Sequence, residues 1–205
     1  MWKHLKKLDL SYNQDYLCGT DEAGRGPIAG PVTAAAVVLN YKIPIEELND
    51  SKKLSEKKRN LCFQKIIYTA LDWAVCSICS SEIDRVNILN ASLEAMKRAV
   101  SSLCLPCNLV LVDGNRQIPH MAIEQRTIVK GDSKSAAIAA ASILAKCCRD
   151  KIMLDYHQQF PQYLFHQHKE YPTKKHMELL NKYGPTPIHR FSFEPLRSMN
   201  QLTLF

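Results

Sequence analysis

Four carboxylates in this sequence of 205 residues each follow an apolar run and lie beside a glycine or a turn. They are Asp21, Glu22, Asp113 and Asp132. Apolar runs of this kind predict buried strands, and ligands of α/β sheets gather at the carboxyl ends of the strands. Carboxylates that converge on one place cannot all stay ionised without a cation, so the pattern predicts a hard divalent ion, Mg²⁺ or Mn²⁺. Two such ions would activate a water and stabilise the leaving oxygen of a phosphodiester.

Each of these carboxylates also has a structural interpretation. Asp113 stands in a sequence typical of turns, and Asp132 stands where it could cap the alanine-rich helix that follows. Asp21 and Glu22 are adjacent, and adjacent residues of a regular strand face opposite sides of the sheet. The two can share a site only if the strand ends or distorts there, and we expect Ala23-Gly24 to supply the break.

The segment directly after the first pair of carboxylates is Gly24-Arg25-Gly26-Pro27. Its two glycines leave backbone N–H and C=O groups unobstructed, and Arg25 offers a bidentate contact to a phosphate. Taken alone, such a short glycine motif is weak evidence of function.

Two CxxC pairs, Cys76/Cys79 and Cys104/Cys107, have a spacing compatible with zinc. The first pair lies in a strand-like run, in which residues three apart point to opposite faces. The segment between the pairs has the spacing of an amphipathic helix rather than of a short loop. Buried, reduced thiols are therefore the favoured interpretation of the eight cysteines.

The elements that would position these residues alternate between strands and helices. Strands are predicted over residues 16–20, 31–39, 73–79 and 109–112 and in the stretch 126–132. One helix is predicted to begin at Ser55 and another to cover Leu89–Leu103. Further helices are predicted in the alanine-rich segment 135–148 and in the polar remainder from about Asp150. This order implies an α/β sheet domain followed by a helical extension that docks on it.

The charge and composition indicate a folded protein with a polyanionic partner. Lysine and arginine number 27 against 20 acidic residues, a net charge of +7, and 46% of the residues are hydrophobic. This balance excludes a wholly disordered chain, and the charge favours nucleic acid over a membrane surface as partner. The basic residues nearest the motifs are Lys52, Lys53, Lys57, Lys58, Arg59, Lys146 and Arg149. As a group we expect them to contact phosphates, although each alone is typical of a solvated helix face.

The N-terminal stretch MWKHLKKLDL lacks the uninterrupted apolar run of a secretory signal. No other stretch approaches the ~18 apolar residues of a spanning helix. We therefore expect a soluble, cytoplasmic protein without a membrane partner, and we expect it to be a monomer.

Six blocks of the sequence follow one another in a specific order. They are residues 21–27 (DEAGRGP), 49–54 (NDSKKL), 112–115 (VDGN), 130–132 (KGD), 140–146 (AASILAK) with Arg149-Asp150, and 189–193 (HRFSF). Together they resemble bacterial ribonuclease HII from about Tyr16 to Arg197. The resemblance implies an RNase H-like mixed sheet flanked by helices. It implies an N-terminal segment (1–15), a catalytic domain (16–198) whose C-terminal helical extension begins near residue 151, and a tail (199–205).

The resemblance also implies a metal-dependent endonuclease. Its substrates would be the RNA strand of RNA/DNA hybrids and ribonucleotides embedded in duplex DNA, cut on their 5′ side to leave 3′-hydroxyl and 5′-phosphate ends. Such an enzyme would serve to remove ribonucleotides from DNA. A non-catalytic hybrid-binding module is the alternative, but it has no need for four strand-end carboxylates.

The resemblance assigns roles by position. Asp21, Glu22, Asp113 and Asp132 would be the catalytic ligands of Mg²⁺ or Mn²⁺, with two ions during catalysis. Gly24, Arg25 and Gly26 would read the 2′-hydroxyl and the phosphate at the junction, because that hydroxyl is what distinguishes RNA from DNA. The other expected substrate contacts are Tyr171, on the sugar that follows the ribonucleotide, and the basic residues Lys52, Lys146 and Arg149. His168, His176 and His189 are expected to be structural or to contact phosphate, because two-metal hydrolysis needs no imidazole base.

Three features near the C-terminus stand apart. Leu164 and Glu170 occupy positions at which the family usually has glycine, and Glu170 adds a negative charge beside a phosphate-binding surface. The last five residues, Gln201–Phe205, look like the pentapeptide by which bacterial replication proteins bind the sliding clamp. An apolar tail folded back on the last helix is the alternative for these residues.

Overall fold

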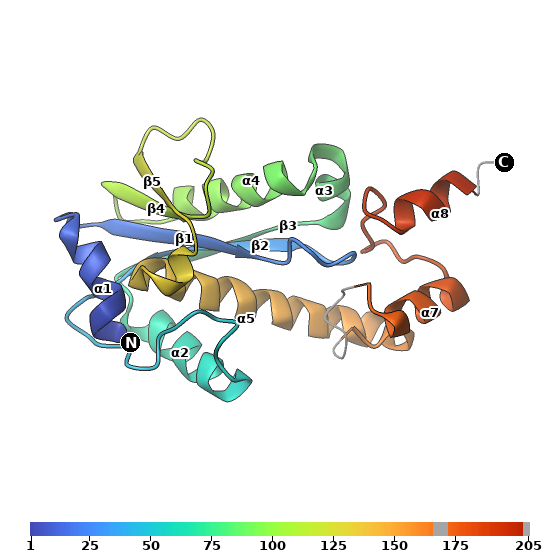
Figure 1. The fold of residues 1–205 in the computed structure, drawn as a ribbon, viewed down its shortest axis with the longest axis horizontal. Coiled ribbons are helices and arrows are strands. Elements are labelled where there is room, and N and C mark those ends of the chain that lie inside the picture. Colours follow the sequence, from blue (N-terminus) through green and yellow to red (C-terminus); the bar gives the residue numbers. More distant parts are fainter. Residues whose placement is uncertain (166–171, 203–205) are drawn as a thin grey trace.

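A mixed five-stranded sheet forms the centre of the molecule. The computed structural model describes residues 1–165 and 172–202, with the backbone alone at 200–202. In spatial order the strands are β3 (Asp72–Ile78), β2 (Val32–Val38), β1 (Leu17–Ala23), β4 (Leu109–Asp113) and β5 (Glu124–Ile128). β1, β2 and β3 pair antiparallel, whereas β1, β4 and β5 pair parallel (Figure 1). The predicted mixed sheet is therefore confirmed.

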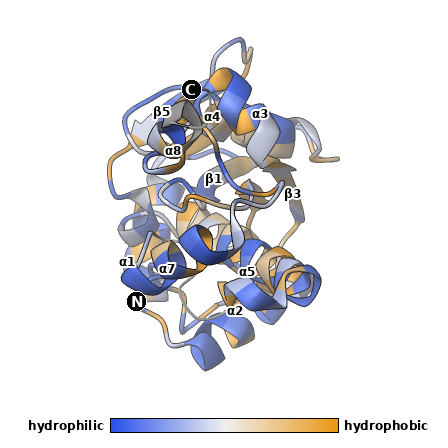
Figure 2. Cartoon of the chain, turned by 90° about the vertical axis from the view of Figure 1, so that its right-hand side faces the viewer, coloured by the Kyte–Doolittle hydropathy of each residue, from blue (hydrophilic) through white to orange (hydrophobic). Residues whose placement is uncertain are grey.

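Helices cover both faces of this sheet (Figure 2). α3 (Ser80–Val86) and α4 (Ile88–Ser101) lie on one face, and α2 (Glu56–Thr69) and α5 (Ala136–Gln159) lie on the other. Alternate residues of β2 face the two sides, because Ala35 joins the core under α5 and Ala34 joins the core under α4. Burial on both faces explains the almost wholly apolar sequence of this strand.

α5 approaches β1 more closely than ordinary side chains permit. A Cβ atom at Gly19 would lie 2.2 Å from the carbonyl carbon of Ala137. The residues that begin α5, Ala136–Ala141, are all buried, and five of the six are alanine. Small residues on both elements therefore bring the helix directly against the strand that carries the first two carboxylates.

α1 (Trp2–Ser11) packs against the core under α5, to which Trp2 and Leu5 contribute. The buried carboxylate of Asp9 accepts hydrogen bonds from the Ala137 N–H and from the Tyr41 hydroxyl, both at 2.9 Å. A carboxylate at the N-terminus of a helix interacts favourably with the helix dipole. α1 therefore helps to hold the beginning of α5 in place.

The C-terminal extension is continuous with α5. The helix passes through Asp150 without a break, so the boundary predicted near residue 151 is not a change of structure. The elements that follow are η2 (Pro161–Tyr163), α7 (Lys174–Tyr183) and α8 (Leu196–Leu202). They share a small hydrophobic core around Tyr163 and Phe165, to which Ile28, Ala29 and Met153 also contribute. Along the described ranges, no helix combines the length and the apolarity needed to cross a bilayer.

A buried histidine pair lies in this second core. The Nε2 atoms of His176 and His189 are 3.2 Å apart, and the Thr186 N–H donates to Nδ1 of His189 at 2.9 Å. Both imidazole rings also pack on the ring of Tyr163. This burial fits the structural role predicted for the two histidines, whereas His168 lies outside the described residues.

Leu164 has the backbone conformation that favours glycine. Its φ of 53° is in the left-handed region, which costs an L-residue with a side chain about 1–2 kcal/mol. The usual family glycine therefore has a physical reason at this position, and Leu164 takes its place with strain. The other predictions for this region, which concern Glu170, Tyr171 and the side chains of 201–205, lie outside the described residues.

Candidate active site

Two parallel strands bring Asp21 and Asp113 side by side. β1 and β4 pair in register as far as Thr20 and Val112, so the next residue on each strand is a carboxylate. Leu111 lies in the core under α5, and side chains two residues apart on a strand share a face. Asp113 and its neighbour Asp21 therefore lie on the face that α5 covers.

Glu22 follows Asp21 within a regular strand, and β1 does not end at Thr20 as predicted. Its pairing with β2 continues until Ala23 lies opposite Thr33, and the chain turns only at Gly24, where φ is 96°. The predicted break at Ala23-Gly24 is thus present, but it comes after both carboxylates. Pairing with β4 stops earlier, so this part of β1 has an open edge toward β4. Side chains from opposite faces of the strand can reach that edge, which is why no distortion between the two carboxylates is needed.

Asp132 reaches the same region through a short helical turn. It lies in η1 (Gly131–Ser133), which follows β5, and the Gly131 N–H donates to Oδ1 of Asp113 at 2.7 Å. Ser135 caps α5, because its Oγ accepts a hydrogen bond from the Ile138 N–H at 3.2 Å. The alternative interpretation of Asp132 as a helix cap is therefore wrong.

Burial and repulsion between carboxylates, in that order, set the electrostatics of this region. Burial raises the pKa of Asp21 well above its usual value, and the charges of Glu22 and Asp113 raise it further. Burial also raises the pKa of Asp132, and the nearby carboxylates Asp50 and Asp113 add to the effect. A divalent cation would relieve this repulsion, and oxygen donors are the ligands that Mg²⁺ and Mn²⁺ prefer. The residues present therefore fit such an ion.

Arg25 partly compensates the charge of Glu22. Burial raises the pKa of Glu22, whereas the guanidinium of Arg25 lowers it, with Nη1 lying 3.3 Å from Oε1 of Glu22. The Arg25 side chain is half exposed. It therefore connects the acidic centre with the exposed loop that follows β1.

The described His, Cys, Asp and Glu side chains include no group of three already placed to hold an ion. For the cysteines, Cys76 lies within β3 and Cys79 precedes α3, so the first CxxC pair is divided between two elements.

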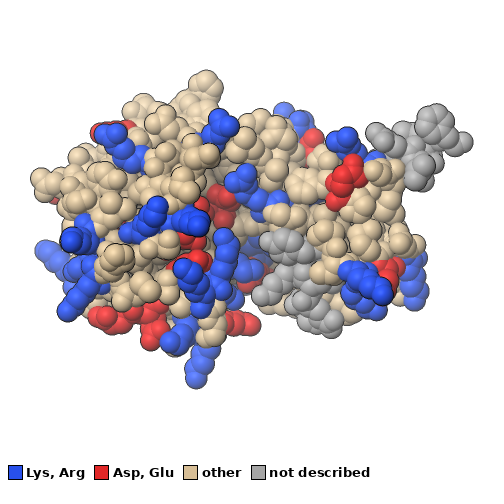
Figure 3. Space-filling view, in the orientation of Figure 1, with Lys and Arg blue, Asp and Glu red and all other residues tan. Residues whose placement is uncertain are grey.

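Two hollows flank Glu22 and Arg25. The larger, of about 320 Å³, is lined by residues 22–27 and by Lys52, Ser142, Lys146 and other residues of the 51–52 segment and α5. The smaller, of about 220 Å³, is lined by residues 113–116 and by α4. Figure 3 shows acidic side chains in the middle of one face, with lysine and arginine gathered around them. A phosphate chain laid across this face would meet basic groups on both sides of an acidic centre.

The basic residues predicted to contact phosphate divide into three groups. Lys52 and Lys146 line the larger hollow. Arg59 is buried and donates to the carbonyl oxygen of Ser51 at 2.9 Å, so the phosphate contact predicted for it is wrong. Three others are exposed outside the hollow, namely Lys53, Lys57 and Lys58. Lys52, Lys146 and the buried Arg149 are thus the members of this set that line the larger hollow.

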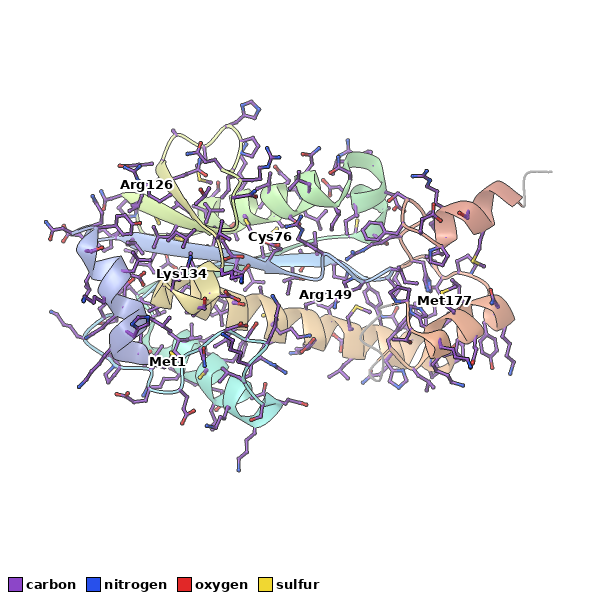
Figure 4. The ribbon with its side chains drawn as sticks, in the orientation of Figure 1. Met1, Cys76, Arg126, Lys134, Arg149 and Met177 are labelled. Carbon is purple, nitrogen blue, oxygen red and sulfur yellow. The ribbon has the colours of Figure 1, made fainter. Side chains whose placement is uncertain are left out.

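Arg149 lies beneath the loop that joins β1 to β2. Figure 4 labels it between α5 and the strands, where it donates to the carbonyls of Ala29 and Pro31 at 3.1 and 3.0 Å. It is buried, and a Cβ at Gly24 would lie 2.1 Å from its Nε. Arg149 also lines the larger hollow, so the substrate contact expected of it stays a prediction. Its contacts show that it supports the loop and requires glycine at position 24.

Arg190 is a further functional candidate, whose role does not follow from its place in the sequence. It is fully buried, and its guanidinium hydrogen-bonds four carbonyl oxygens of the same loop. The acceptors are Gly24 (2.6 Å), Arg25 (3.1 Å), Pro27 (2.7 Å) and Gly30 (2.9 Å). The only feature of the sequence that points to Arg190 is its position in the block 189–193, which lies far along the chain from the other charged motifs.

Comparisons with known proteins point to one family and one fold. A family model described as Ribonuclease HII matches residues 18–196. Ribonuclease HII of Idiomarina loihiensis is 55% identical over 183 residues, which are 89% of this chain and 97% of that protein. The crystal structure of ribonuclease H2 from Pyrococcus horikoshii OT3 has a TM-score of 0.74 at 28% identity, and the match covers 91% of this chain and 97% of that one. The PCNA:RNase HII complex from Archaeoglobus fulgidus has a TM-score of 0.68 at 22% identity, covering 87% and 95% of the two chains, and it supports the fold alone.

Proposed function

The chain belongs to the ribonuclease HII family and is a ribonuclease H, and we propose that it cuts duplex DNA on the 5′ side of embedded ribonucleotides. We propose that it also hydrolyses the RNA strand of RNA/DNA hybrids. In both cases the products carry 3′-hydroxyl and 5′-phosphate ends. Its role is then to remove ribonucleotides from DNA during repair and replication.

One observation carries this proposal, namely the convergence of Asp21, Glu22 and Asp113 at one edge of the sheet beside an exposed glycine loop. In the proposal these carboxylates and Asp132 hold Mg²⁺ or Mn²⁺, which when bound supplies an activated water and stabilises the leaving oxygen. The Gly131 N–H keeps Asp113 oriented by donating to its Oδ1. A non-catalytic binding module would have no use for carboxylates that repel one another at a phosphate-binding surface.

The residues around the larger hollow bind and orient the substrate. Gly24, Arg25 and Gly26 present backbone groups and a guanidinium to the ribose and the phosphate at the junction. Lys52 and Lys146 neutralise phosphates from the other side of the hollow. These contacts select a ribonucleotide in a duplex and place its 5′ phosphodiester over the carboxylates.

Asp113→Asn tests the role of the carboxylates. The variant keeps an oxygen for the Gly131 N–H but loses the charge, so cleavage is expected to fall by at least about a hundredfold. Duplex affinity should remain within about threefold, because it depends on the basic residues. Asp155→Asn, an exposed carboxylate on α5, is the matched control. Cleavage by Asp113→Asn at the rate of this control would refute the assignment.

We also propose that residues 201–205 bind a sliding clamp. The support is the sequence of the tail and the relative from Archaeoglobus fulgidus, whose structure was solved as a complex with PCNA. The first two residues of this peptide, Gln201 and Leu202, are the last two of α8. Deletion of residues 201–205 should abolish clamp binding and leave cleavage of short duplexes unchanged. Unchanged clamp affinity would exclude this role.

A further inference from the structure

Two buried guanidinium groups hold the loop between β1 and β2 from beneath. Arg190 donates to carbonyl oxygens in the first half of this loop and at Gly30, and Arg149 donates to those of Ala29 and Pro31. Six carbonyl groups of residues 24–31 thus face these two side chains. Since a buried polar group is costly unless it is paired, this set of hydrogen bonds fixes the backbone of the loop.

The direction of these carbonyls determines the direction of the neighbouring amides. The peptide bonds of the loop are trans, so the C=O of one residue and the N–H of the next point in opposite directions. The carbonyls of Gly24 and Arg25 point to Arg190, and the N–H groups of Arg25 and Gly26 therefore point away from it. Both residues are exposed and line the larger hollow. Within the described part of the chain, neither N–H has a hydrogen-bond acceptor.

We propose that Arg190 is a positioning residue for ribonucleotide selectivity. By holding the carbonyls inward, it fixes the N–H groups of Arg25 and Gly26 as two donors that face the hollow. A ribose 2′-hydroxyl and the adjoining phosphate are oxygen acceptors of matching chemistry. The inference rests on the function proposed for this loop and extends it to a buried residue that does not line the hollow.

Arg190 is itself anchored from α3. The carboxylate of Asp84 accepts hydrogen bonds from the N–H groups of Phe191 and Ser192, both at 2.9 Å. It also accepts one from the Ser192 hydroxyl at 2.6 Å. Asp84 thus fixes the backbone immediately after Arg190. A substitution of Asp84 should therefore loosen the contact of Arg190 with the loop without changing a residue of the loop itself.

The test compares binding of two fluorescent duplexes that differ only in one ribonucleotide, in EDTA so that neither is cleaved. Wild-type protein should prefer the duplex with the ribonucleotide. Arg190→Lys keeps the charge but cannot reach four carbonyls, so the preference should fall by about tenfold, as expected for two lost hydrogen bonds. Affinity for the all-DNA duplex should change by less than about threefold, because lysines outside the loop supply it. A merely structural role would weaken both duplexes equally.

Two further variants complete the test. Arg85→Lys, an exposed position on α3 next to Asp84, is the matched control and should retain the wild-type preference. Asp84→Asn should reduce the preference by about threefold, and it decides the question if Arg190→Lys does not fold. If Arg190→Lys folds and keeps the wild-type preference for the ribonucleotide duplex, the proposal is overturned. If only Asp84→Asn folds and it keeps the wild-type preference, the proposal is likewise overturned. Wild-type protein without any preference would instead refute the proposed function of the loop.

Discussion

At Asp21 the site acts against the stability of the fold. Burial and the charges of Glu22 and Asp113 raise its pKa well above the value in the unfolded chain. A carboxyl group with a raised folded-state pKa stabilises the fold below its unfolded pKa, and that contribution is lost as pH rises through the folded value. The free energy of unfolding should therefore decrease as pH rises through the folded pKa of Asp21.

Asp21→Asn should stabilise the protein while it abolishes cleavage. The amide keeps an oxygen for the Glu22 N–H, which donates to Oδ1 of Asp21 at 2.7 Å, but removes the repelled charge. Without divalent ions at pH 8, the midpoint of thermal unfolding should rise by about 3–5 °C. Mn²⁺ should raise the midpoint of the wild type more than that of the variant. An unfolding midpoint below that of Asp155→Asn would contradict this account of the site.

The residues of the acidic centre can be predicted from the sequence, because they lie near the carboxyl ends of three strands, β1, β4 and β5. Asp50 and Arg190 cannot be found in this way. Asp50 acts on the pKa of Asp132 from a loop distant in sequence, and Arg190 lies 160 residues after the carbonyl that its Nε contacts. Both roles depend on long-range packing, which leaves no local pattern.

At the scale of elements, the beginning of α5 joins several parts of the structure. It lies against Gly19 of β1, follows η1 with Asp132, and receives the carboxylate of Asp9 from α1. The alanine-rich composition of the helix and the apolar sequence of β2 make both elements predictable. The residue at which β1 ends is not predictable, because the strand's length depends on which neighbouring strand continues to pair with β1 after Thr20.

Asp9→Ala measures how much α1 contributes to this arrangement. The variant loses the acceptor of the Ala137 N–H and of the Tyr41 hydroxyl, and both donors then remain buried without it. The free energy of unfolding should fall by about 1–2 kcal/mol, as measured by urea denaturation. Asp15→Ala, an exposed carboxylate in the same N-terminal segment, should change it by less than about 0.5 kcal/mol. Equal stability of the two variants would show that α1 does not hold α5.

At the scale of the whole molecule, the net charge of +7 is the sum of two opposed parts. A basic surface surrounds an acidic centre, as Figure 3 shows. This net charge predicts that the partner is negatively charged. It cannot predict which lysines face the substrate, because that depends on the packing that buries Arg59 and Arg149 and leaves Lys52 at the hollow.

Lys52→Gln tests the basic surface through its salt dependence. Loss of one phosphate contact should weaken binding to every duplex similarly and reduce the slope of log affinity against log salt by about one. The adjacent Lys53→Gln is the control, because Lys53 lies outside the hollow with its Nζ 3.8 Å from Oδ2 of Asp50. Equal slopes for Lys52→Gln and the wild type would remove Lys52 from the interface.

The central claim is that this molecule recognises a single ribonucleotide in DNA and cuts beside it. The most direct measurement is incubation with duplex DNA containing one ribonucleotide, with Mg²⁺, with Mn²⁺ and with EDTA, followed by mapping of the product ends. We predict one cut on the 5′ side of the ribonucleotide with a divalent ion, leaving a 3′-hydroxyl, and none with EDTA or in the all-DNA duplex. No cut at the ribonucleotide with either ion, or equal cleavage of the all-DNA duplex, would contradict the account.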